Sequence, residues 1–146
     1  MPTLNSEGAD GRVLLLAPTG RDATLISGVL GAEGVSAEAC GDIEEFCRKL
    51  SDGAGAAFIT EEALTPFALQ YLVEALRGQP QWSDFPIVLL TRGGESGPVN
   101  PAVLKALGED GNVTLVERPT HVITLMSALR AALRARRRQY EMRAHL

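Results

Sequence analysis

The sequence predicts an α/β fold in which one parallel sheet is covered by helices on both faces. Two observations carry this prediction. Five short apolar segments recur along the 146 residues, and stretches with helical spacing and capping signals separate them. The first apolar segment, 13–17, holds no polar residue, as expected for a strand buried on both faces. Right-handed crossovers would then place all five strands in one sheet within a single domain.

The expected elements follow in chain order. The strands are expected at 13–17, 35–40, 56–60, 87–91 and 113–117. The helices are expected at 21–32, 43–50, 66–77 and 101–107, and a last one begins near His121. Thr65 and Asn100 each precede a proline, which pairs a capping residue with proline at the first helical position. Asp42 and Glu45 fit a capping box at the start of the second helix.

The charge is distributed unevenly along the chain. Residues 1–119 hold eight Lys/Arg and 17 Asp/Glu, a net charge of −9, whereas residues 120–146 hold six Arg and one Glu, a net charge of +5. A basic helix on an acidic body is poorly suited to non-specific DNA binding, and no groove-reading motif accompanies it. We therefore expect no nucleic-acid partner. The arginines are interpreted most simply as a solvated helix face, and a signalling linker is the better functional interpretation of this helix.

Composition also indicates the cellular compartment and the domain organisation. No apolar run approaches the roughly 20 residues of a membrane span, and the N-terminus lacks the features of a secretory signal. Cys40 and Cys47 are too few for a disulfide framework, and we expect them to be buried or half-buried free thiols. These features predict a cytoplasmic protein without membrane contact. We expect a mobile tail at 1–11, one domain at 12–134 and a helical extension at 135–146.

Three local patterns within 12–134 resemble the receiver domain of bacterial response regulators. Residues 56–61 resemble its third strand, which ends in a phospho-accepting aspartate. Residues 84–91 resemble the fourth strand, which ends in a hydroxyl residue, and 113–119 resemble the fifth, which ends in Lys-Pro. The resemblance implies a flavodoxin-like (CheY-like) doubly wound sheet with strand order 2-1-3-4-5 and a role in two-component signal transduction.

The resemblance also implies a site from which the metal-binding acids are missing. The corresponding positions are Ala17 and Pro18 for the acidic pair, Glu61 for the acceptor aspartate, Thr91 for the hydroxyl, and Arg118 and Pro119 for Lys-Pro. Magnesium needs oxygen ligands, and phosphoryl transfer depends on that ion to neutralise charge. Alanine and proline side chains supply no oxygen. We therefore expect a degenerate receiver (pseudo-receiver) that binds no metal or other cofactor, is not an enzyme, and is not phosphorylated in the usual Mg²⁺-dependent way.

Glu61 leaves two interpretations open. Its carboxylate, near Thr91 or Arg118, could resemble a permanently charged switch. The simpler interpretation is a salt bridge with Arg118 that holds the strand ends together, while Thr91 is an ordinary β-branched strand residue.

The last segment predicts a long helix. From Thr120 to Leu146 no glycine or proline interrupts it, and 27 such residues would span about 40 Å. Its first part has the spacing to pack on the sheet, and a weak coiled-coil seam continues beyond it. The residues assigned to this dimer or linker helix are Leu125, Leu129, Ala132, Gln139, Met142 and Leu146. The segment resembles helices that join receiver-like domains to PAS or histidine-kinase modules, so we expect a homodimer and the N-terminal part of a sensor histidine kinase or related protein.

A small-molecule site is the alternative. The turn from Thr19 to Asp22 follows the first strand and opens a helix, and such a helix start can hold phosphate on backbone N–H groups. It would make the chain a nucleotide- or flavin-binding domain. However, the glycine patterns of dinucleotide and P-loop sites are absent, and a helix cap explains the turn without a ligand. The two histidines and two cysteines lack the spacing of a zinc site.

Overall fold

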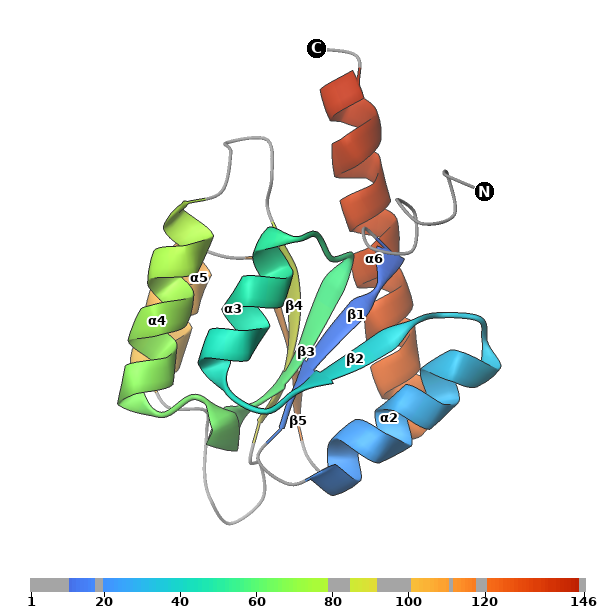
Figure 1. Ribbon diagram of the computed structural model, residues 1–146, viewed down its shortest axis with the longest axis horizontal. Helices are drawn as coiled ribbons and strands as arrows, with labels where there is room; N and C mark the ends of the chain where they lie inside the picture. Colours follow the sequence, from blue (N-terminus) through green and yellow to red (C-terminus); the bar gives the residue numbers. More distant parts are fainter. Residues whose placement is uncertain are drawn as a thin grey trace.

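Ten helices and strands and one short 3₁₀ turn make up the described part of the computed structural model (Figure 1). The structure describes residues 11–17, 20–78, 85–91, 101–110, 112–117 and 121–144. The strands are β1 (Val13–Leu16), β2 (Ala37–Cys40), β3 (Ala56–Thr60), β4 (Pro86–Thr91) and β5 (Asn112–Glu117). The helices are α2 (Gly20–Ala32), α3 (Ile43–Ser51), α4 (Pro66–Arg77), α5 (Pro101–Asp110) and α6 (Val122–Ala144), and the 3₁₀ turn is η1 (Glu61–Ala63).

The strands form one parallel sheet in the order β2-β1-β3-β4-β5. This order, together with the long last helix, confirms the predicted flavodoxin-like fold. Each expected strand and helix is present. The second strand begins two residues later than expected, because Gly34, with φ +80°, turns the chain after α2, although the Ser36 carbonyl already accepts a hydrogen bond from the Val13 N–H at 2.9 Å. The N–H groups of Gly34 and Val35 donate to the carbonyls of Gly31 and Leu30, which satisfies the end of α2.

Strand side chains alternate between two apolar layers. Leu14 and Leu16 pack with α3, α4 and α5, whereas Val13 and Leu15 pack with α2 and α6. The same alternation runs through β3 and β4, so the central strands are buried along their whole length. Figure 1 shows these layers, with α6 crossing one face of the sheet and projecting past its end.

Two of the expected capping signals form as predicted. The Asp42 side chain accepts a hydrogen bond from the Glu45 N–H at 2.8 Å, and the Glu45 carboxylate accepts one from the Gly41 N–H at 2.7 Å. At α4, the Thr65 hydroxyl accepts from the Ala68 N–H at 3.2 Å, with Pro66 at the first helical position. The expected caps at Asn100 and Thr19 lie outside the described residues. None of the described helices combines the length and apolar character that crossing a membrane requires.

Candidate functional site

The register of the sheet brings four strand ends together at its carboxyl edge. Leu16, the last residue of β1, pairs with Ile59, and Thr60, the last residue of β3, pairs with Leu90. Thr91 at the end of β4 pairs with Glu117 at the end of β5. Because the strands are parallel, Ala17, Glu61 and Thr91 occupy neighbouring positions along this edge. In open α/β sheets this edge is where ligands bind.

Two polar residues of the predicted site are buried at this edge. Thr91 continues the face of Ile87 and Leu89 and is 3% exposed. Glu61 is 6% exposed and begins η1, whose turn closes with the Leu64 N–H donating to the Glu61 carbonyl at 3.0 Å. Glu61 has at least one further interaction partner. Pro18, Arg118 and Pro119 lie outside the described residues, so the expected pairing of Glu61 with Arg118 stays a prediction.

Ala17 lies at the end of β1, at one of the two positions that hold the acidic pair in receiver domains. Its half-buried methyl group packs against the apolar cluster that β1 forms with α2 and α6. A methyl group offers no ligand to a metal ion. Within the described ranges, no three His, Cys, Asp or Glu side chains converge in a group that could hold a metal ion.

Thr60 is a feature of this edge that sequence reasoning missed. It is fully buried, on the face of β3 that carries Ala56 and Phe58 toward α2 and α6. Its hydroxyl oxygen has no hydrogen-bond partner among the residues that the structure describes. A buried hydroxyl without a partner costs free energy, so strand propensity alone does not account for a threonine here.

Comparison with known proteins gives the fold. No family model matches the sequence, and no curated protein matches it. A CheY-like receiver domain protein from Methanospirillum hungatei matches with a TM-score of 0.70 and 13% identity, covering 88% of this chain and 97% of that one. Chemotaxis protein CheY4 of Vibrio cholerae matches with a TM-score of 0.67 and 18% identity, covering 84% and 98%. The N-terminal domain of a three-domain response regulator/sensory box/GGDEF protein from Carboxydothermus hydrogenoformans matches with a TM-score of 0.65 and 22% identity, covering 92% and 99%.

The chain has the receiver fold. At these identities the likeness establishes the architecture alone, and the chemistry of this edge depends on the residues present. Those residues include a methyl group at Ala17 and buried polar side chains at Glu61 and Thr91.

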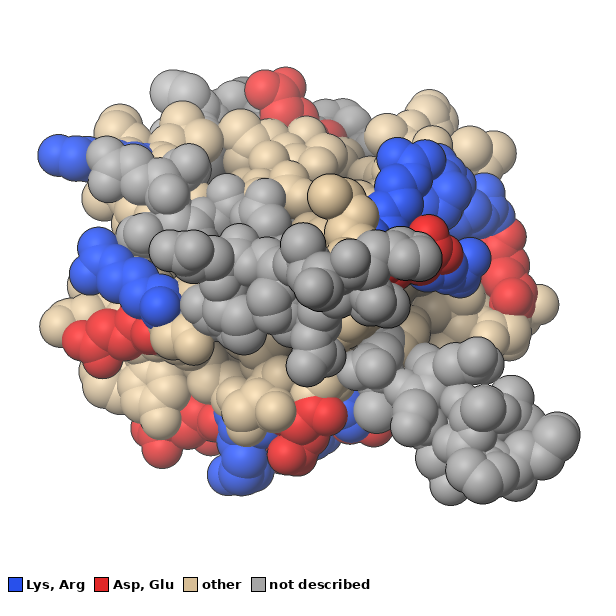
Figure 2. All heavy atoms as spheres, turned by 90° about the horizontal axis from the view of Figure 1, so that it is seen from above, with Lys and Arg blue, Asp and Glu red and all other residues tan. Residues whose placement is uncertain are grey.

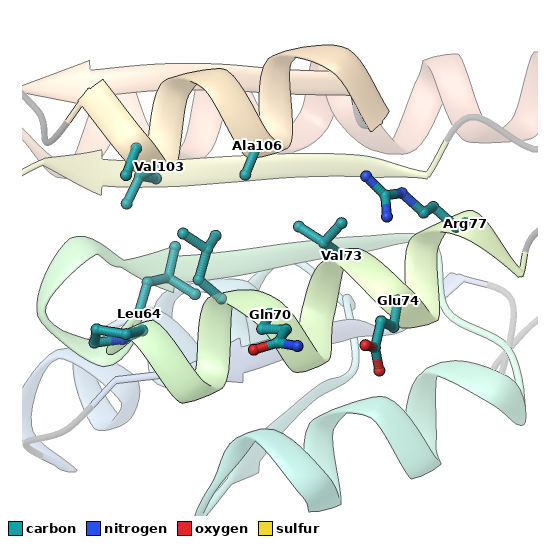
Figure 3. A pocket seen from close by; sticks show the side chains of 10 residues that line it. Leu64, Gln70, Val73, Glu74, Arg77, Val103 and Ala106 are labelled. Atoms are coloured by element: carbon teal, nitrogen blue, oxygen red, sulfur yellow. The ribbon is translucent and has the colours of Figure 1, made fainter.

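A groove lies elsewhere on the receiver fold, between α4 and α5 (Figure 3). Its volume is about 390 Å³, and its lining is mostly apolar. In Figure 3, Arg77 extends from the end of α4 toward α5. The lining residues are Leu64, Pro66, Leu69, Gln70, Val73, Glu74, Arg77, Ala102, Val103 and Ala106. Sequence patterns do not indicate this groove, because its walls come from two helices that only the fold brings together.

The seam expected on the last helix is largely used inside the receiver domain. Leu125, Leu129 and Ala132 are buried in the cluster that α6 forms with the sheet, so in this structure they are not available to a second chain. Gln139 is half-buried, and Met142 is exposed. Leu146 lies outside the described residues. A seam between two chains could therefore use only the end of α6.

One arginine of the expected solvated face is buried, which corrects that interpretation. Arg130, Arg134, Arg137 and Arg138 are exposed, and Arg130 forms an ion pair with Glu33, in the turn after α2. Arg136, in contrast, is 7% exposed. Its place could have been found from spacing, because it lies four residues after Ala132 on the stripe that faces the sheet. In the view from above, the largest group of Lys and Arg side chains lies at the upper right with Asp and Glu beside it, and smaller groups lie at the left and the bottom (Figure 2).

The two cysteines are free, with Cys40 buried and Cys47 half-buried, as predicted. Burial raises the pKa of the Cys40 thiol to about 11. Burial, and to a lesser degree the neighbouring Cys40, raises the pKa of Cys47 to about 11 as well. Thiols that stay protonated at neutral pH are poor nucleophiles and poor metal ligands.

Proposed function

We propose that this receiver-fold domain is a non-catalytic signalling module that acts through protein–protein contact and is not phosphorylated with Mg²⁺. The observation that carries the proposal is the methyl group of Ala17, packed at the end of β1 where a receiver needs metal-binding oxygen. Glu61 keeps a carboxylate at the acceptor position, but phosphoryl transfer to it would lack the ion that neutralises charge on the transferring oxygens.

Incubation with acetyl phosphate and MgCl₂, followed by intact-mass measurement, tests the proposal. The wild-type chain is expected to gain no phosphoryl group. A variant with Ala17→Asp, Pro18→Asp and Glu61→Asp restores the missing acids and serves as the positive comparison. Stable labelling of the wild-type chain that disappears in Glu61→Ala would overturn the proposal, because it would show acceptance at Glu61 without the acidic pair.

Exposed apolar side chains support a role in protein contact. Leu104 on α5, Leu115 on the edge strand β5 and Ile123 in the first turn of α6 are all exposed, and Ile123 is 81% exposed. Met142, near the end of α6, is exposed as well. Of these four side chains, Met142 lies at the end of α6, beyond the residues buried against the sheet, and it is the one that supports a contact through this helix.

We assign the contact to a homodimer formed through the end of α6, as the sequence predicts. Sedimentation of the wild-type chain at increasing concentration is expected to show a dimer. Met142→Glu should shift it to monomer, whereas Ile123→Glu, which alters the start of the same helix, should not. A wild-type chain that remains monomeric at high concentration, or a dimer lost only in Ile123→Glu, would move the contact away from the helix end.

The proposal places the domain in the cytoplasm, in a longer signalling protein of the sensor histidine kinase type, with α6 as its link to the downstream module. Two observations support this position. The receiver-fold domain from Carboxydothermus hydrogenoformans is the N-terminal part of a three-domain protein. In this chain, α6 runs from Val122 to Ala144 and projects beyond the sheet (Figure 1). A complete gene product without a downstream signalling module would contradict it.

A further inference from the structure

Helix α6 is held to the body by two different kinds of contact. Its first half packs through Leu125, Met126, Leu129 and Ala132, which are buried in the cluster with β1, β3 and β4. Among the described residues, the buried apolar side chains of α6 end at Ala132, and the next buried side chain on the helix is Arg136. A cation thus takes the place of an apolar residue on the stripe that faces the sheet.

Arg136 is enclosed by aromatic rings and polar groups. Its guanidinium carbon lies 5.3 Å from the centre of the Phe85 ring and 4.7 Å from that of the Tyr140 ring. Its Nε donates to the Ala54 carbonyl at 3.4 Å, and one of its terminal nitrogens donates to Gln139 Oε1 at 2.9 Å. The guanidinium is planar, so it can stack on rings and donate in its own plane at the same time.

These contacts fasten α6 to the amino edge of the sheet. Ala54 lies just before β3, and Phe85 lies just before β4. Tyr140 and Gln139 belong to α6 itself, one turn further along, so they fix the guanidinium on the helix side. Arg136 therefore joins the second half of α6 to the residues just before two central strands, β3 and β4.

The two kinds of contact respond differently to strain. Apolar burial is non-directional and is spread over many atoms, so the first half of α6 tolerates small shifts. Stacking and hydrogen bonds depend on the position of one guanidinium, so they are lost together when it moves. Segments with few buried apolar contacts can open locally while the rest of the protein stays folded.

We propose that Arg136 is a latch that fixes the exit of α6, and that the helix beyond Ala132 detaches as a unit when the latch opens. This inference deepens the proposed function, because α6 is the proposed link to the downstream module. The latch sets whether that link leaves the body as a rigid continuation of the domain or as a loose segment. Arg136 acts through the position of α6, so it is a positioning residue.

Amide hydrogen exchange of the wild-type chain, measured at increasing sub-denaturing urea, tests the inference first. Amides at 137–142 are expected to exchange through a local opening with weak urea dependence. Amides at 126–132 are expected to exchange through the global unfolding of the domain, with strong urea dependence. A single class of opening shared by both segments would overturn the inference, and this comparison does not depend on any variant.

Arg136→Ala and Arg137→Ala form a matched pair of variants. The two arginines are consecutive residues of the same helix, and only Arg136 is buried. We expect Arg136→Ala to speed exchange at 137–142 by roughly tenfold or more, and Arg137→Ala to leave it within about twofold. Arg136→Lys keeps the charge without the stacking plane and should give an intermediate rate. Equal effects of the two alanine variants would show ordinary fraying and would overturn the latch.

The measurement separates this inference from the proposed function. Exchange is measured at a concentration at which the chain sediments as a monomer, so a dimer contact at the end of α6 cannot protect 137–142, and the result does not depend on whether the chain accepts a phosphoryl group. If exchange shows the local opening of α6 but the chain is phosphorylated, the inference about Arg136 holds and the proposed function is wrong. If the chain is unphosphorylated and dimeric but α6 shows a single class of opening, the proposed function holds and the inference about Arg136 is wrong.

Discussion

The two ends of the sheet are built in different ways. At the carboxyl end, Glu61 and Thr91 are buried next to an alanine, and the fully buried Thr60 hydroxyl has no hydrogen-bond partner among the described residues. At the amino end, Arg12 and Arg136 are engaged in hydrogen bonds that join different elements. The polar side chains at the carboxyl end occupy the positions of the proposed site, whereas those at the amino end join different elements of the fold.

The network around Arg12 shows what the amino end does. Its guanidinium donates to the Lys49 carbonyl at 2.7 Å, to the Gly53 carbonyl at 2.9 Å and to the Glu38 carboxylate at 3.0 Å. Lys49 completes the group with a 3.3 Å ion pair to the second oxygen of Glu38. One side chain thereby joins the start of β1 to β2, to the end of α3 and to the loop before β3. The side chains that join elements at the amino end are therefore separate from the polar side chains at the carboxyl end, an arrangement in which the proposed absence of metal-binding acids does not affect the contacts around Arg12.

Replacing Arg12 should produce the largest loss of stability. Arg12→Ala leaves two backbone carbonyls and part of the Glu38 carboxylate without their donor, and the Arg12 side chain is only 13% exposed. We expect the free energy of unfolding in urea to fall by about 2–3 kcal/mol. Arg48→Ala, at an exposed position on α3, is the control and should cost under about 0.5 kcal/mol. Equal losses in the two variants would remove the contrast between the two ends of the sheet.

The fold was predictable from the sequence because each element carries its own signal. The unbroken apolar segment at 13–16 indicates a strand buried on both faces, and the Thr65-Pro66 pair marks the start of α4. Local signals of this kind agree with the global fold, and the parallel order then follows from the crossover rules. The positions of Ala17, Glu61 and Thr91 along one edge follow from the same register.

The parts that could not be predicted depend on contacts between distant segments. Arg136 sits among five arginines in nine residues, and composition alone indicates a solvated face. Its burial depends on Phe85, which is 51 residues earlier in the chain. The unpartnered hydroxyl of Thr60 and the groove between α4 and α5 are likewise invisible to periodicity, which reports the face of an element and not its neighbours.

Two threonines allow the carboxyl end to be tested by the same substitution. Thr65 caps α4 through its hydroxyl, so Thr65→Val should cost about 1 kcal/mol in urea unfolding. Thr60 has no such partner among the described residues, so Thr60→Val should leave stability unchanged or raise it by up to about 1 kcal/mol. A loss of stability in Thr60→Val as large as that in Thr65→Val would show that the Thr60 hydroxyl makes a hydrogen bond at this edge. The carboxyl end would then retain a polar contact that contributes to stability.

The smallest expected effect is the pH dependence that Glu38 gives to the amino end. Partial burial alone would raise the pKa of Glu38, but the hydrogen bonds and charges of Lys49 and Arg12 outweigh it and hold the pKa below its ordinary value of 4.5. A carboxyl group with a lowered pKa in the folded state stabilises the protein above the pKa of the unfolded state. That contribution is lost as the pH falls through the folded pKa.

Glu38→Gln should therefore destabilise the protein at pH 7, and the difference from wild type should shrink as the pH falls below 4.5. The Glu38 side chain is 37% exposed, so solvent screening limits the loss at pH 7 to under about 1 kcal/mol. Urea unfolding at pH 7, 4.5 and 3 measures the difference, with Glu141→Gln on the exposed end of α6 as the control. A difference that stays constant with pH would mean that Glu38 acts by packing and not by charge. The polar contribution to stability at the amino end would then come from the hydrogen bonds between Arg12 and its backbone partners alone.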